Sequence, residues 1–254
     1  MSEYLMRRNT VLEALRGDRR EIYRLWLQKG LDRKLTQPIF DAAKARSIPI
    51  KTIAKQELGH MAQDSSHQGV LLEVGPYRYS DIDEILGLAA VRGEKPFILL
   101  LDLLHGPQNI GALLRTAEIC GVHGVIVQDR RAPDVTTAVS GFSVGATEHL
   151  LIAQVTNLVQ AIRELQARDV WIAGLDMTDD SQPVDSVDLD MPLGIVVGHE
   201  GQGLRRLVRQ SCDLIVELPM RGHVESLNAA VAGSVMLYAA WRARGYNGRK
   251  QGSS

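Results

Sequence analysis

Residues 217–233 read Glu217-Leu218-Pro219-Met220-Arg221-Gly222-His223-Val224-Glu225-Ser226-Leu227-Asn228-Ala229-Ala230-Val231-Ala232-Gly233. They combine the end of an apolar strand, a loop containing Pro and Gly, and the polar start of an apolar helix. Such a junction directs backbone donors and small polar side chains into a cleft. The segments 102–117 and 198–203 have the same strand-to-loop character. Three such loops on one sheet indicate one composite site.

Short apolar runs alternate with helical patterns around these loops. The expected strands are 97–101, 124–127, 150–153, 170–174, 194–197 and 214–218, and the expected helices are 110–120, 157–167, 204–210 and 227–242. Nearly uninterrupted apolar strands separated by helices predict an α/β fold with a mainly parallel sheet that is covered on both faces. Ligands of such sheets bind beyond the carboxyl ends of the strands. Because Asp102, Gly198 and Pro219 each follow such an end, the fold and the local motifs predict the same binding edge.

A smaller α/β unit precedes this sheet. Its expected order is helix 10–15, strand 22–27, helix 34–46, strand 50–53, helix 55–61 and strand 69–74. The breakers Gly75-Pro76 and a helical pattern over 81–91 indicate a linker. We therefore expect a first domain over 1–75, a linker over 76–95, a second domain over 96–245 and a flexible tail over 246–254.

The composition is that of an ordinary globular protein. The chain has 254 residues, of which 45% are apolar and 23% are charged, which suits one large domain or a small and a medium one. The N-terminus lacks the apolar core of a signal peptide, and the longest uncharged helical candidate, 226–241, is too short and too polar to span a membrane. We expect a cytoplasmic protein without a membrane segment. Cys120 and Cys212 lack the spacing of a disulfide framework or a metal site, so both are expected to be packing residues.

The net charge of −1 hides an asymmetry along the chain. Residues 1–78 contain 14 Lys and Arg against 9 Asp and Glu, whereas the remainder contains 15 against 21. The arginines of the basic part gather in two groups, Arg7 with Arg8, and Arg16 with Arg19, Arg20 and Arg24. Such groups suit contact with a phosphate backbone. Charge alone equally allows a solvated protein face.

Several common sites are excluded by the sequence. The chain contains no Gly-Lys pair, which rules out a Walker phosphate loop. Gly201-Gln202-Gly203 lacks the third glycine and the chain position of a dinucleotide fingerprint. His199-Glu200 resembles the start of a zinc-binding H-E-x-x-H helix, but Gly203 occupies the second His position and the glycines oppose a helix. We therefore expect no metal site.

The first loop offers a helix entrance and a cation. Asn109 can cap a helix, and Gly111 lets another chain approach closely. Arg115 lies four residues after Gly111 on the same helix face, where its guanidinium could hold a phosphate or an oxygen-bearing substrate. Outside this motif, an Arg paired with a surface carboxylate is the plainer interpretation.

The other two loops suit a ligand held against the backbone. Three glycines in 198–203 permit positive φ angles and leave room for a flat or extended ligand, although a tight turn explains two of them. Ser226 is the expected N-cap of helix 227–242, whose apolar stripe indicates core or interface. Asn228 follows in the first turn, where its amide can orient a substrate hydroxyl.

Together, the three segments closely resemble the motifs of the SpoU (TrmH-like) RNA ribose 2′-O-methyltransferases. The family motifs are Asn-x-Gly-x-x-x-Arg-Thr-Ala, Gly-x-Glu-Gly-x-Gly and Pro-Met-x-Gly-x-x-x-Ser-Leu-Asn, and they begin here at Asn109, Gly198 and Pro219. The segments 8–15 and 67–70 resemble the ribosomal-protein-L30e-like RNA-binding domain of the 23S rRNA guanosine-2′-O-methyltransferase subgroup.

This resemblance implies a SPOUT-like second domain with a deep trefoil knot, a small L30e-like first domain, and a homodimer that uses the last helix. It implies S-adenosylmethionine as the cofactor, in a pocket lined by Val197, Gly198, Glu200, Gly203, Leu218, Met220, Ser226 and Leu227. It places around the reacting ribose the residues Asn109, Arg115, Glu200, Ser226 and Asn228. The RNA contacts expected in the first domain are Arg7, Arg8, Arg19, Arg20, Arg24, His67 and Gln68.

The implied reaction is attack of a ribose 2′-oxygen on a sulfonium-bound methyl carbon, which needs alignment and proton removal more than it needs a metal. Arg115 is the first catalytic candidate. Because a free guanidinium has a pKa above about 12, we expect Arg115 to orient phosphate and hydroxyl rather than act as the base. We expect His199, and Ala229-Ala230 in place of the family's more usual Val-Ser, to affect the pocket shape or the preferred nucleotide.

The expected substrate is a guanosine of 23S rRNA, with another rRNA ribose, including a uridine, or tRNA as alternatives. Two competing interpretations are an RNA-binding protein of the same fold without turnover and a regulator that binds S-adenosylmethionine. The complete set of site residues argues against both.

Overall fold

The computed structural model describes residues 3–129, 135–224 and 226–249. The chain divides into two compact units by its contacts. Unit 1 is Met1–Tyr79 with Val135–His149, and unit 2 is Ser80–Asp134 with Leu150–Ser254. Residues 135–149 lie within the second domain expected from the sequence, yet they group with unit 1. That grouping depends on long-range contacts, which local sequence patterns do not reveal.

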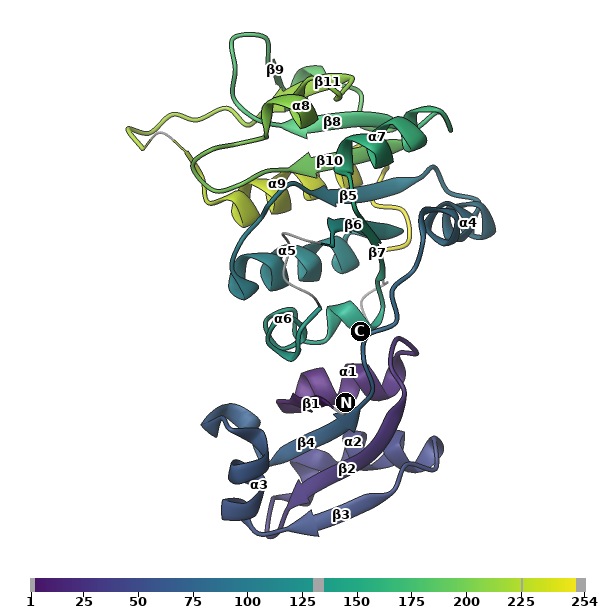
Figure 1. Ribbon diagram of the computed structural model, residues 1–254, viewed down its shortest axis with the longest axis vertical. Coiled ribbons are helices and arrows are strands. Elements are labelled where there is room, and N and C mark those ends of the chain that lie inside the picture. Colours follow the sequence, from purple (N-terminus) through teal and green to yellow (C-terminus); the bar gives the residue numbers. More distant parts are fainter. Residues whose placement is uncertain (1–2, 130–134, 225, 250–254) are drawn as a thin grey trace. The chain divides into compact units, whose positions relative to one another are not determined.

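Unit 1, in its described part, is built on a four-stranded sheet of order β1-β4-β2-β3 (Figure 1). Its main elements are β1 (Glu3–Met6), α1 (Arg8–Arg16), β2 (Ile22–Gln28), α2 (Arg33–Ala45), β3 (Ile50–Ile53), α3 (Lys55–Ala62), β4 (Val70–Val74) and α6 (Thr137–Phe142). Strand β4 is antiparallel to β1 and β2, whereas β2 and β3 are parallel. The sequence patterns miss β1 and α6, because an edge strand of 4 residues and a helix of 6 residues are too short to show a period.

Helices cover both faces of this sheet. Leu72 of β4 packs in a cluster with Leu15 of α1 and Ile39 of α2. Its neighbour Leu71 packs instead with Leu58 of α3. The two leucines separate because successive strand side chains point to opposite faces. Each such fully buried side chain contributes about 1.5–3 kcal/mol relative to an exposed one.

A buried ionic group joins the two chain segments of unit 1. Arg20 is only 5% exposed, and its guanidinium pairs with Glu148 at 3.2 Å and with Glu3 at 2.9 Å. It also donates a hydrogen bond to the carbonyl oxygen of Val135 at 2.9 Å. Arg20 is therefore a structural residue, which corrects the prediction that it contacts RNA. Charge counting along the sequence cannot separate a buried arginine from an exposed one.

Unit 2, within the described residues, contains a seven-stranded parallel sheet of order β7-β6-β5-β10-β8-β11-β9. Its strands are β5 (Phe97–Leu101), β6 (Gly124–Gln128), β7 (Leu151–Val155), β8 (Trp171–Leu175), β9 (Gln182–Pro183), β10 (Leu193–Val197) and β11 (Leu214–Glu217). Its helices are α4 (Ile82–Arg92), α5 (Pro107–Ile119), α7 (Leu158–Gln166), α8 (Arg206–Arg209) and α9 (Ala229–Ala243). The predicted α/β fold with a mainly parallel sheet is confirmed.

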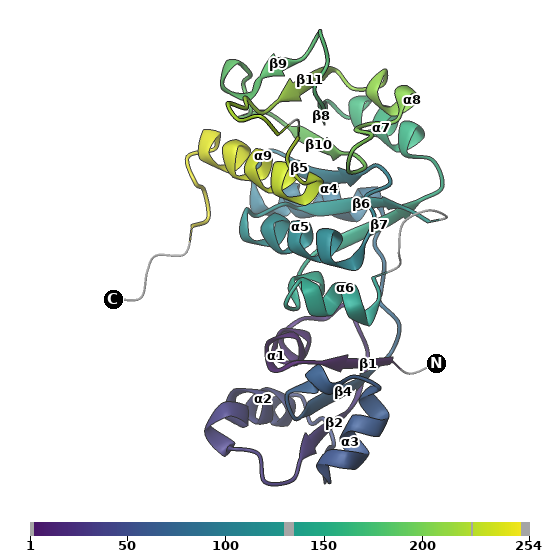
Figure 2. The same cartoon turned by 90° about the vertical axis from the view of Figure 1, so that its left-hand side faces the viewer.

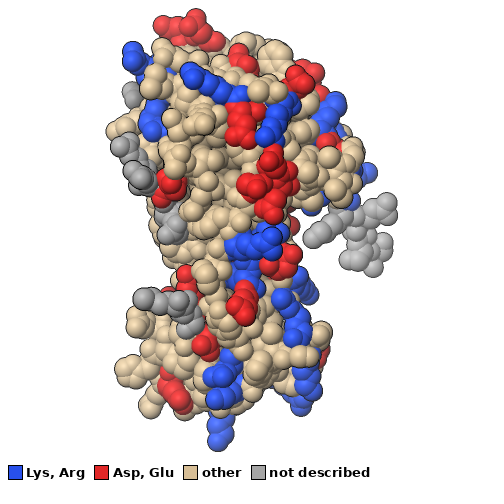
Figure 3. All heavy atoms as spheres, turned by 45° about the vertical axis from the view of Figure 1, so that its right-hand side comes forward, with Lys and Arg blue, Asp and Glu red and all other residues tan. Residues whose placement is uncertain are grey.

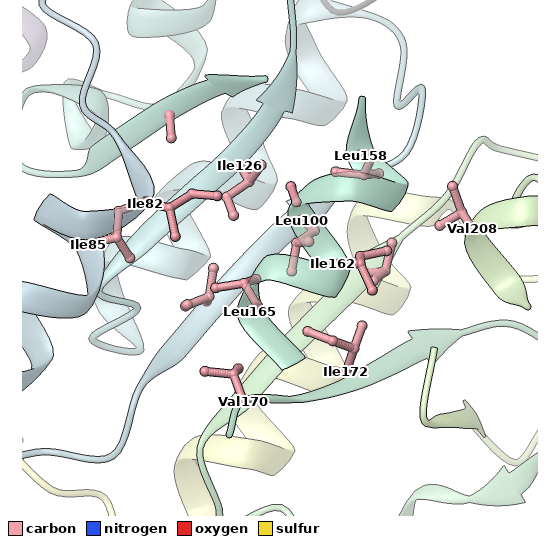
Figure 4. Close-up of a cluster of buried hydrophobic side chains, with 14 of the residues drawn as sticks. Ile82, Ile85, Leu100, Ile126, Leu158, Ile162, Leu165, Val170, Ile172 and Val208 are labelled. Carbon is pink, nitrogen blue, oxygen red and sulfur yellow. The ribbon is translucent and has the colours of Figure 1, made fainter. Parts of the chain in front are cut away.

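The helices of unit 2 form two layers around the sheet. Helices α4, α7 and α8 lie on one face, and α5 and α9 lie on the other (Figures 1 and 2). Figure 4 shows the side chains of α7 gathered with Leu100 of β5 and Ile172 of β8. On the other face α9 approaches β10 closely, since a Cβ on Gly233 would lie 3.0 Å from Val197 Cγ2. Both faces are thus closed, which leaves the strand ends as the place for a site.

Candidate active site

Loops from neighbouring strands meet at the carboxyl edge of the unit 2 sheet. Strand β10 lies between β5 and β8, and its last residue Val197 pairs in register with Leu101 and Leu175. The three strands therefore end at the same level, so the loops that follow them are neighbours. The first of these loops begins with Asp102, whose backbone N–H donates to the carbonyl oxygen of Val197 at 2.8 Å.

A buried carboxylate fastens two of these loops together. Asp102 is fully buried and accepts hydrogen bonds from the backbone N–H of Arg205 at 2.8 Å and from its Nε at 2.6 Å. The guanidinium of Arg205 also donates to Gln128 Oε1 at 2.6 Å. Charge-assisted pairs of this kind are about twice as strong as neutral hydrogen bonds. Asp102 thus positions the segment after β10 and offers no free carboxylate to a ligand.

Glycines give the loop after β10 its shape. Gly201 and Gly203 have φ angles of 82° and 64°, in the left-handed region that favours glycine. A Cβ on Gly198 would lie 2.4 Å from the carbonyl oxygen of Gly203. His199 and Gly203 exchange two backbone hydrogen bonds of 3.0 Å. Residue 198 must therefore be Gly, because the two ends of the loop touch there.

Three side chains from the three sequence motifs form one hydrogen-bonded cluster. Asn228 Nδ2 donates to Glu200 Oε1 at 2.8 Å and to Asn109 Oδ1 at 3.1 Å. Asn109 Nδ2 donates to Glu200 Oε2 at 3.2 Å. Glu200 is exposed, and a carboxylate that accepts two hydrogen bonds still has lone pairs for a ligand hydroxyl. The fold thus brings these three predicted ribose-site residues into contact.

The N-cap of α9 differs from the one expected. Asn228 is the cap, and its Oδ1 accepts hydrogen bonds from the backbone N–H groups of Ala230 and Val231 at 3.0 and 3.2 Å. Ser226 lies two residues earlier, in the exposed loop, so the prediction that Ser226 caps this helix is wrong. Ser and Asn are both favoured caps, and the sequence motif does not separate them.

The start of α5 also differs from the expectation. The helix begins at Pro107 after the cap residue Gly106, which places Asn109 in the first turn rather than at the cap. Arg115 lies further along α5 and is exposed. Its side chain makes no hydrogen bond or ion pair with any of the residues that the structure describes. Its guanidinium is therefore open to an external anion, in contrast to the surface ion pair considered as the plainer interpretation.

A cavity of about 470 Å³ lies beside the polar cluster. Its lining includes the eight residues that the resemblance places around the cofactor, Val197, Gly198, Glu200, Gly203, Leu218, Met220, Ser226 and Leu227. Asp176 and Met177, which follow β8, also line it, as do Arg209 and Glu217. Sequence reasoning missed these residues. The strand-end rule that selected Asp102 would also have selected Asp176, since β8 was an expected strand.

The predicted RNA-binding residues of unit 1 lie partly together at the start of α1. The backbone N–H of Arg8 donates to Gln68 Oε1 at 3.1 Å, and Arg7 donates to Ser66 Oγ at 3.4 Å. Gln68 is exposed, whereas His67 is only 6% exposed, with its Nδ1 accepting a neighbouring backbone N–H. One surface is thus formed by Arg7, Arg8 and Gln68. His67 is buried beneath this surface, where it accepts a hydrogen bond from the backbone N–H of Gly69.

Arg19 and Arg24 have other surroundings. Arg19 pairs with Asp18 at 3.3 Å, and the guanidinium of Arg24 lies 5.2 Å from the ring centroid of Trp26. Figure 3 shows Lys and Arg side chains spread over unit 1 with acidic side chains between them. The basic excess of this unit is therefore distributed and does not form a single continuous patch on the face in view.

Thiol and metal chemistry find no support in the described residues. Burial raises the pKa of Cys120 and of Cys212 to about 12, so both thiols stay protonated at neutral pH and offer no thiolate nucleophile. Across residues 3–129, 135–224 and 226–249, no group of three or more His, Cys, Asp or Glu could hold a metal ion. None of the helices in these ranges is long and apolar enough to cross a membrane.

Known families match both parts of the chain. Residues 96–238 match the SpoU rRNA Methylase family, and residues 8–80 match a family described as RNA 2′-O ribose methyltransferase substrate binding. The chain belongs to the SpoU family of RNA methyltransferases. The family resemblance drawn from the three motifs is thereby confirmed, and this SpoU protein is an RNA ribose methyltransferase.

Relatives of this SpoU protein match it over almost its whole length. YacO of Bacillus subtilis (strain 168), which carries the name of a TrmH family tRNA/rRNA methyltransferase, is 38% identical over 242 residues, 95% of this chain and 96% of its own. The crystal structure of the SpoU methyltransferase AviRb from Streptomyces viridochromogenes in complex with AdoMet is 25% identical, with a TM-score of 0.78, and covers 97% of this chain and 92% of AviRb. An AdoMet-bound rRNA methyltransferase from Sinorhizobium meliloti, 21% identical, covers 95% of this chain and 87% of its own with a TM-score of 0.76, which shows the shared fold.

Proposed function

We propose that this SpoU protein transfers the methyl group of S-adenosylmethionine to the ribose 2′-hydroxyl of a guanosine in 23S rRNA. The observation that carries the proposal is the position of Glu200. This residue lines the cavity and also accepts hydrogen bonds from Asn109 and Asn228. A hydroxyl held by this cluster would therefore lie at the mouth of the cofactor pocket.

The cavity suits S-adenosylmethionine in charge and in shape. When bound, this cofactor supplies a methyl group on a positively charged sulfonium. Glu200 and Glu217 contribute carboxylates to the lining, which favour a cationic ligand. Arg209, which lies 4.0 Å from Asp176, also lines the cavity and can pair with the carboxylate of an amino acid. The missing Cβ of Gly198 lets the loop fold back against Gly203, and this gives that wall of the cavity its shape.

Arg115 and the polar cluster have different tasks in this proposal. Arg115 pairs with a phosphate beside the reacting ribose, because its planar guanidinium presents several N–H donors to the phosphate oxygens. A carboxylate oxygen of Glu200 takes the proton of the 2′-hydroxyl as the 2′-oxygen attacks the methyl carbon. Asn109 and Asn228 hold that carboxylate in one orientation. Alignment of this kind accelerates a displacement without a change in its chemistry.

Unit 1 holds the RNA in this proposal. The surface formed by Arg7, Arg8 and Gln68 contacts structured RNA, with Arg19 and Arg24 as further contacts. The choice of a 23S rRNA guanosine rests on the resemblance of 8–15 and 67–70 to the corresponding subgroup. A ribosomal substrate places the enzyme in the cytoplasm.

We also propose a homodimer and a deep trefoil knot. On α9 and just before it, Leu227, Val231, Val235 and Tyr238 recur at helical spacing and are each between 43% and 49% exposed. Exposed apolar stripes of this kind mark interaction surfaces, and a second copy of the chain is the proposed occupant. The proposed knot involves the segment between β10 and α9, which the resemblance to the family implies.

Two measurements on the purified protein test the function. Calorimetric titration with S-adenosylmethionine should give a single saturable site per chain. A labelled cofactor should then transfer methyl to a 23S rRNA transcript and to no tRNA transcript. Absence of S-adenosylmethionine binding would refute the proposed methyltransferase activity. Cofactor binding without methyl transfer to any RNA would favour a regulator that binds S-adenosylmethionine. Methyl transfer to tRNA alone would contradict 23S rRNA as the substrate and would favour tRNA.

A further inference from the structure

A second cavity in unit 2 lies apart from the proposed cofactor pocket. Its volume is about 770 Å³, and its walls come from α7, α8 and the strand-end residues Gln128 and Thr156. We call it the α7/α8 cleft. It opens at the same carboxyl edge of the sheet as the candidate active site, because Gln128 ends β6 and Thr156 follows β7. None of its lining residues has a role in the chemistry proposed above.

The α7/α8 cleft is basic. Arg163, Arg205 and Arg206 line it, and no acidic side chain does so among the described residues. The charge of Arg205 is balanced by the buried Asp102. Arg163 and Arg206 are exposed, and the guanidinium of neither makes a hydrogen bond or an ion pair with a described residue. Two uncompensated guanidiniums therefore face the same opening.

The helices that carry Arg163 and Arg206 are packed against the apolar core of unit 2. Val208 of α8 and Ile162 of α7 belong to the main apolar cluster of unit 2, as Figure 4 shows. Because that cluster holds both helices, Arg163 and Arg206 project from fixed backbones. Leu207 lies in the same lining and is 61% exposed. It gives the cleft an apolar contact for a sugar or a base beside the charges.

Arg205 connects the cleft to the candidate active site. Its guanidinium donates to Gln128 in the cleft wall and pairs with Asp102 at the start of the first motif loop. Its backbone is separated by Leu204 alone from the glycine loop that carries Glu200. A chain of nucleotides bound at the active site can therefore continue along the strand ends into the cleft.

We infer that the α7/α8 cleft binds the phosphodiester backbone of the RNA substrate outside the reacting nucleotide, through Arg163 and Arg206. The inference rests on the proposed function, which supplies RNA as the substrate. Phosphate groups repeat along the RNA backbone, and guanidiniums pair with them in a planar, two-pronged geometry. Contacts of this kind fix the position of a nucleic acid without reading its sequence.

The test is the double variant R163A/R206A, compared with the wild type and with the control variant R92A/R249A. Arg92 and Arg249 line a different cavity, near the amino end of β5, so the control removes the same charge elsewhere in the unit. Affinity for a 23S rRNA transcript is measured by filter binding over a series of salt concentrations. Calorimetry with S-adenosylmethionine is run on every variant to verify that the fold and the cofactor pocket are intact.

R163A/R206A should bind the transcript about tenfold more weakly than the wild type, with a salt dependence that is shallower by about 1.5 in the log–log slope. Its cofactor affinity should be unchanged, and R92A/R249A should bind RNA as the wild type does. Equal RNA affinity and equal salt slope for R163A/R206A and the wild type would overturn the cleft assignment.

The outcome for the cleft is separable from that for the proposed function. If the wild type methylates the transcript while R163A/R206A binds it normally, only the cleft assignment fails. If the wild type binds but never methylates RNA, and R163A/R206A binds more weakly, the cleft assignment stands and the proposed function fails. Inorganic phosphate added as a competitor should displace the transcript only at high concentration. Displacement at micromolar phosphate would show a site for a free anion and would contradict the RNA assignment.

Discussion

The side chain of Asn228 donates a hydrogen bond to Glu200 Oε1 at 2.8 Å, and its own oxygen caps α9 through the backbone N–H of Ala230 at 3.0 Å. One amide therefore joins the loop after β10 to the last helix. The side-chain oxygen of Asn228 stabilises the start of α9, and its nitrogen orients Glu200 in the candidate active site. The two atoms can be changed separately, because an aspartate keeps the capping oxygen and loses the donor.

N228D should keep the stability of the wild type and lose most of its activity. Asp caps a helix about as well as Asn, but a second carboxylate beside Glu200 repels it and removes the donor that orients it. We expect methyl transfer to fall about 100-fold, and thermal denaturation to change little. N228A removes both functions and should lose a further 0.5–2 kcal/mol or so of stability. Wild-type turnover by N228D would contradict the role given to this amide.

R115A should lose methyl transfer and retain cofactor affinity. Arg115 is exposed on α5 and has no partner among the described residues, so its removal leaves no buried charge and should hardly affect stability. We expect the rate of transfer to fall by about 100-fold or more, since a positioning cation for the ribose phosphate is missing. R115K keeps the charge without the two-pronged geometry and should recover only part of the rate. Calorimetry with the cofactor is the check that the pocket is intact, and undiminished transfer by R115A would sink the assignment.

G198A should abolish cofactor binding. The added Cβ would lie 2.4 Å from the carbonyl oxygen of Gly203, so the loop must open, at a cost of about 1–3 kcal/mol in the free energy of unfolding. Gly222 is the matched control, because a Cβ there meets no atom within 4 Å. Urea denaturation and cofactor titration on G198A and G222A measure both effects. Equal cofactor affinity for the two variants would show that the shape of this loop does not matter.

R20M should destabilise the protein by about 3–5 kcal/mol, because it leaves Glu148 buried without its cation. The double variant R20M/E148M removes both charges and should recover part of that loss. Arg16 pairs with Glu13 at the surface, so R16M is the control and should cost about 0–1 kcal/mol. The urea concentrations at the unfolding midpoints of R20M, R20M/E148M and R16M, compared with that of the wild type, measure these differences in stability. If R20M were as stable as R16M and lost RNA affinity instead, Arg20 would return to the RNA-binding set.

His123 should make stability fall as the pH is lowered through about 6.5. Burial lowers its pKa in the folded state, although the hydrogen bond to Glu94 acts in the opposite direction. The unfolded chain therefore binds a proton more readily than the folded one, so the free energy of unfolding rises with pH between the folded-state pKa and the unfolded value. Denaturation midpoints between pH 5 and pH 8 should show this slope in the wild type and lose it in H123Q. The same slope in H123Q would assign it to another group.

Much of the fold and part of the site could be predicted from the sequence. The apolar runs of unit 2 give its main strands, because a sheet buried on both faces needs continuous apolar residues. The three motifs predict which residues meet, and Asn109, Glu200 and Asn228 do so. The role of each residue at a helix end is not encoded in a motif, so the sequence predicts Ser226 as the cap of α9 although Asn228 caps this helix.

Other features depend on contacts between distant parts of the chain. Arg20 is drawn inside by Glu148, which lies 128 positions later, so no local charge pattern reveals its burial. The same holds for the grouping of 135–149 with unit 1. The α7/α8 cleft is likewise formed by residues of two helices, with Arg163 on α7 and Arg206 on α8. The sequence patterns of these helices indicate which faces are buried, but they do not predict that the two arginines line one cleft.

The most direct test of the central claim is a comparison of the wild type with E200Q in single-turnover methyl transfer. Both proteins are given labelled S-adenosylmethionine and a 23S rRNA transcript, and the RNA is then digested to nucleosides. The wild type should place the label on the ribose of a guanosine. E200Q keeps the size of the side chain but lacks the carboxylate that joins the pocket to the polar cluster, and it should transfer at least about 100-fold more slowly. Transfer by E200Q at the wild-type rate, or label on a base instead of a ribose, would contradict the account.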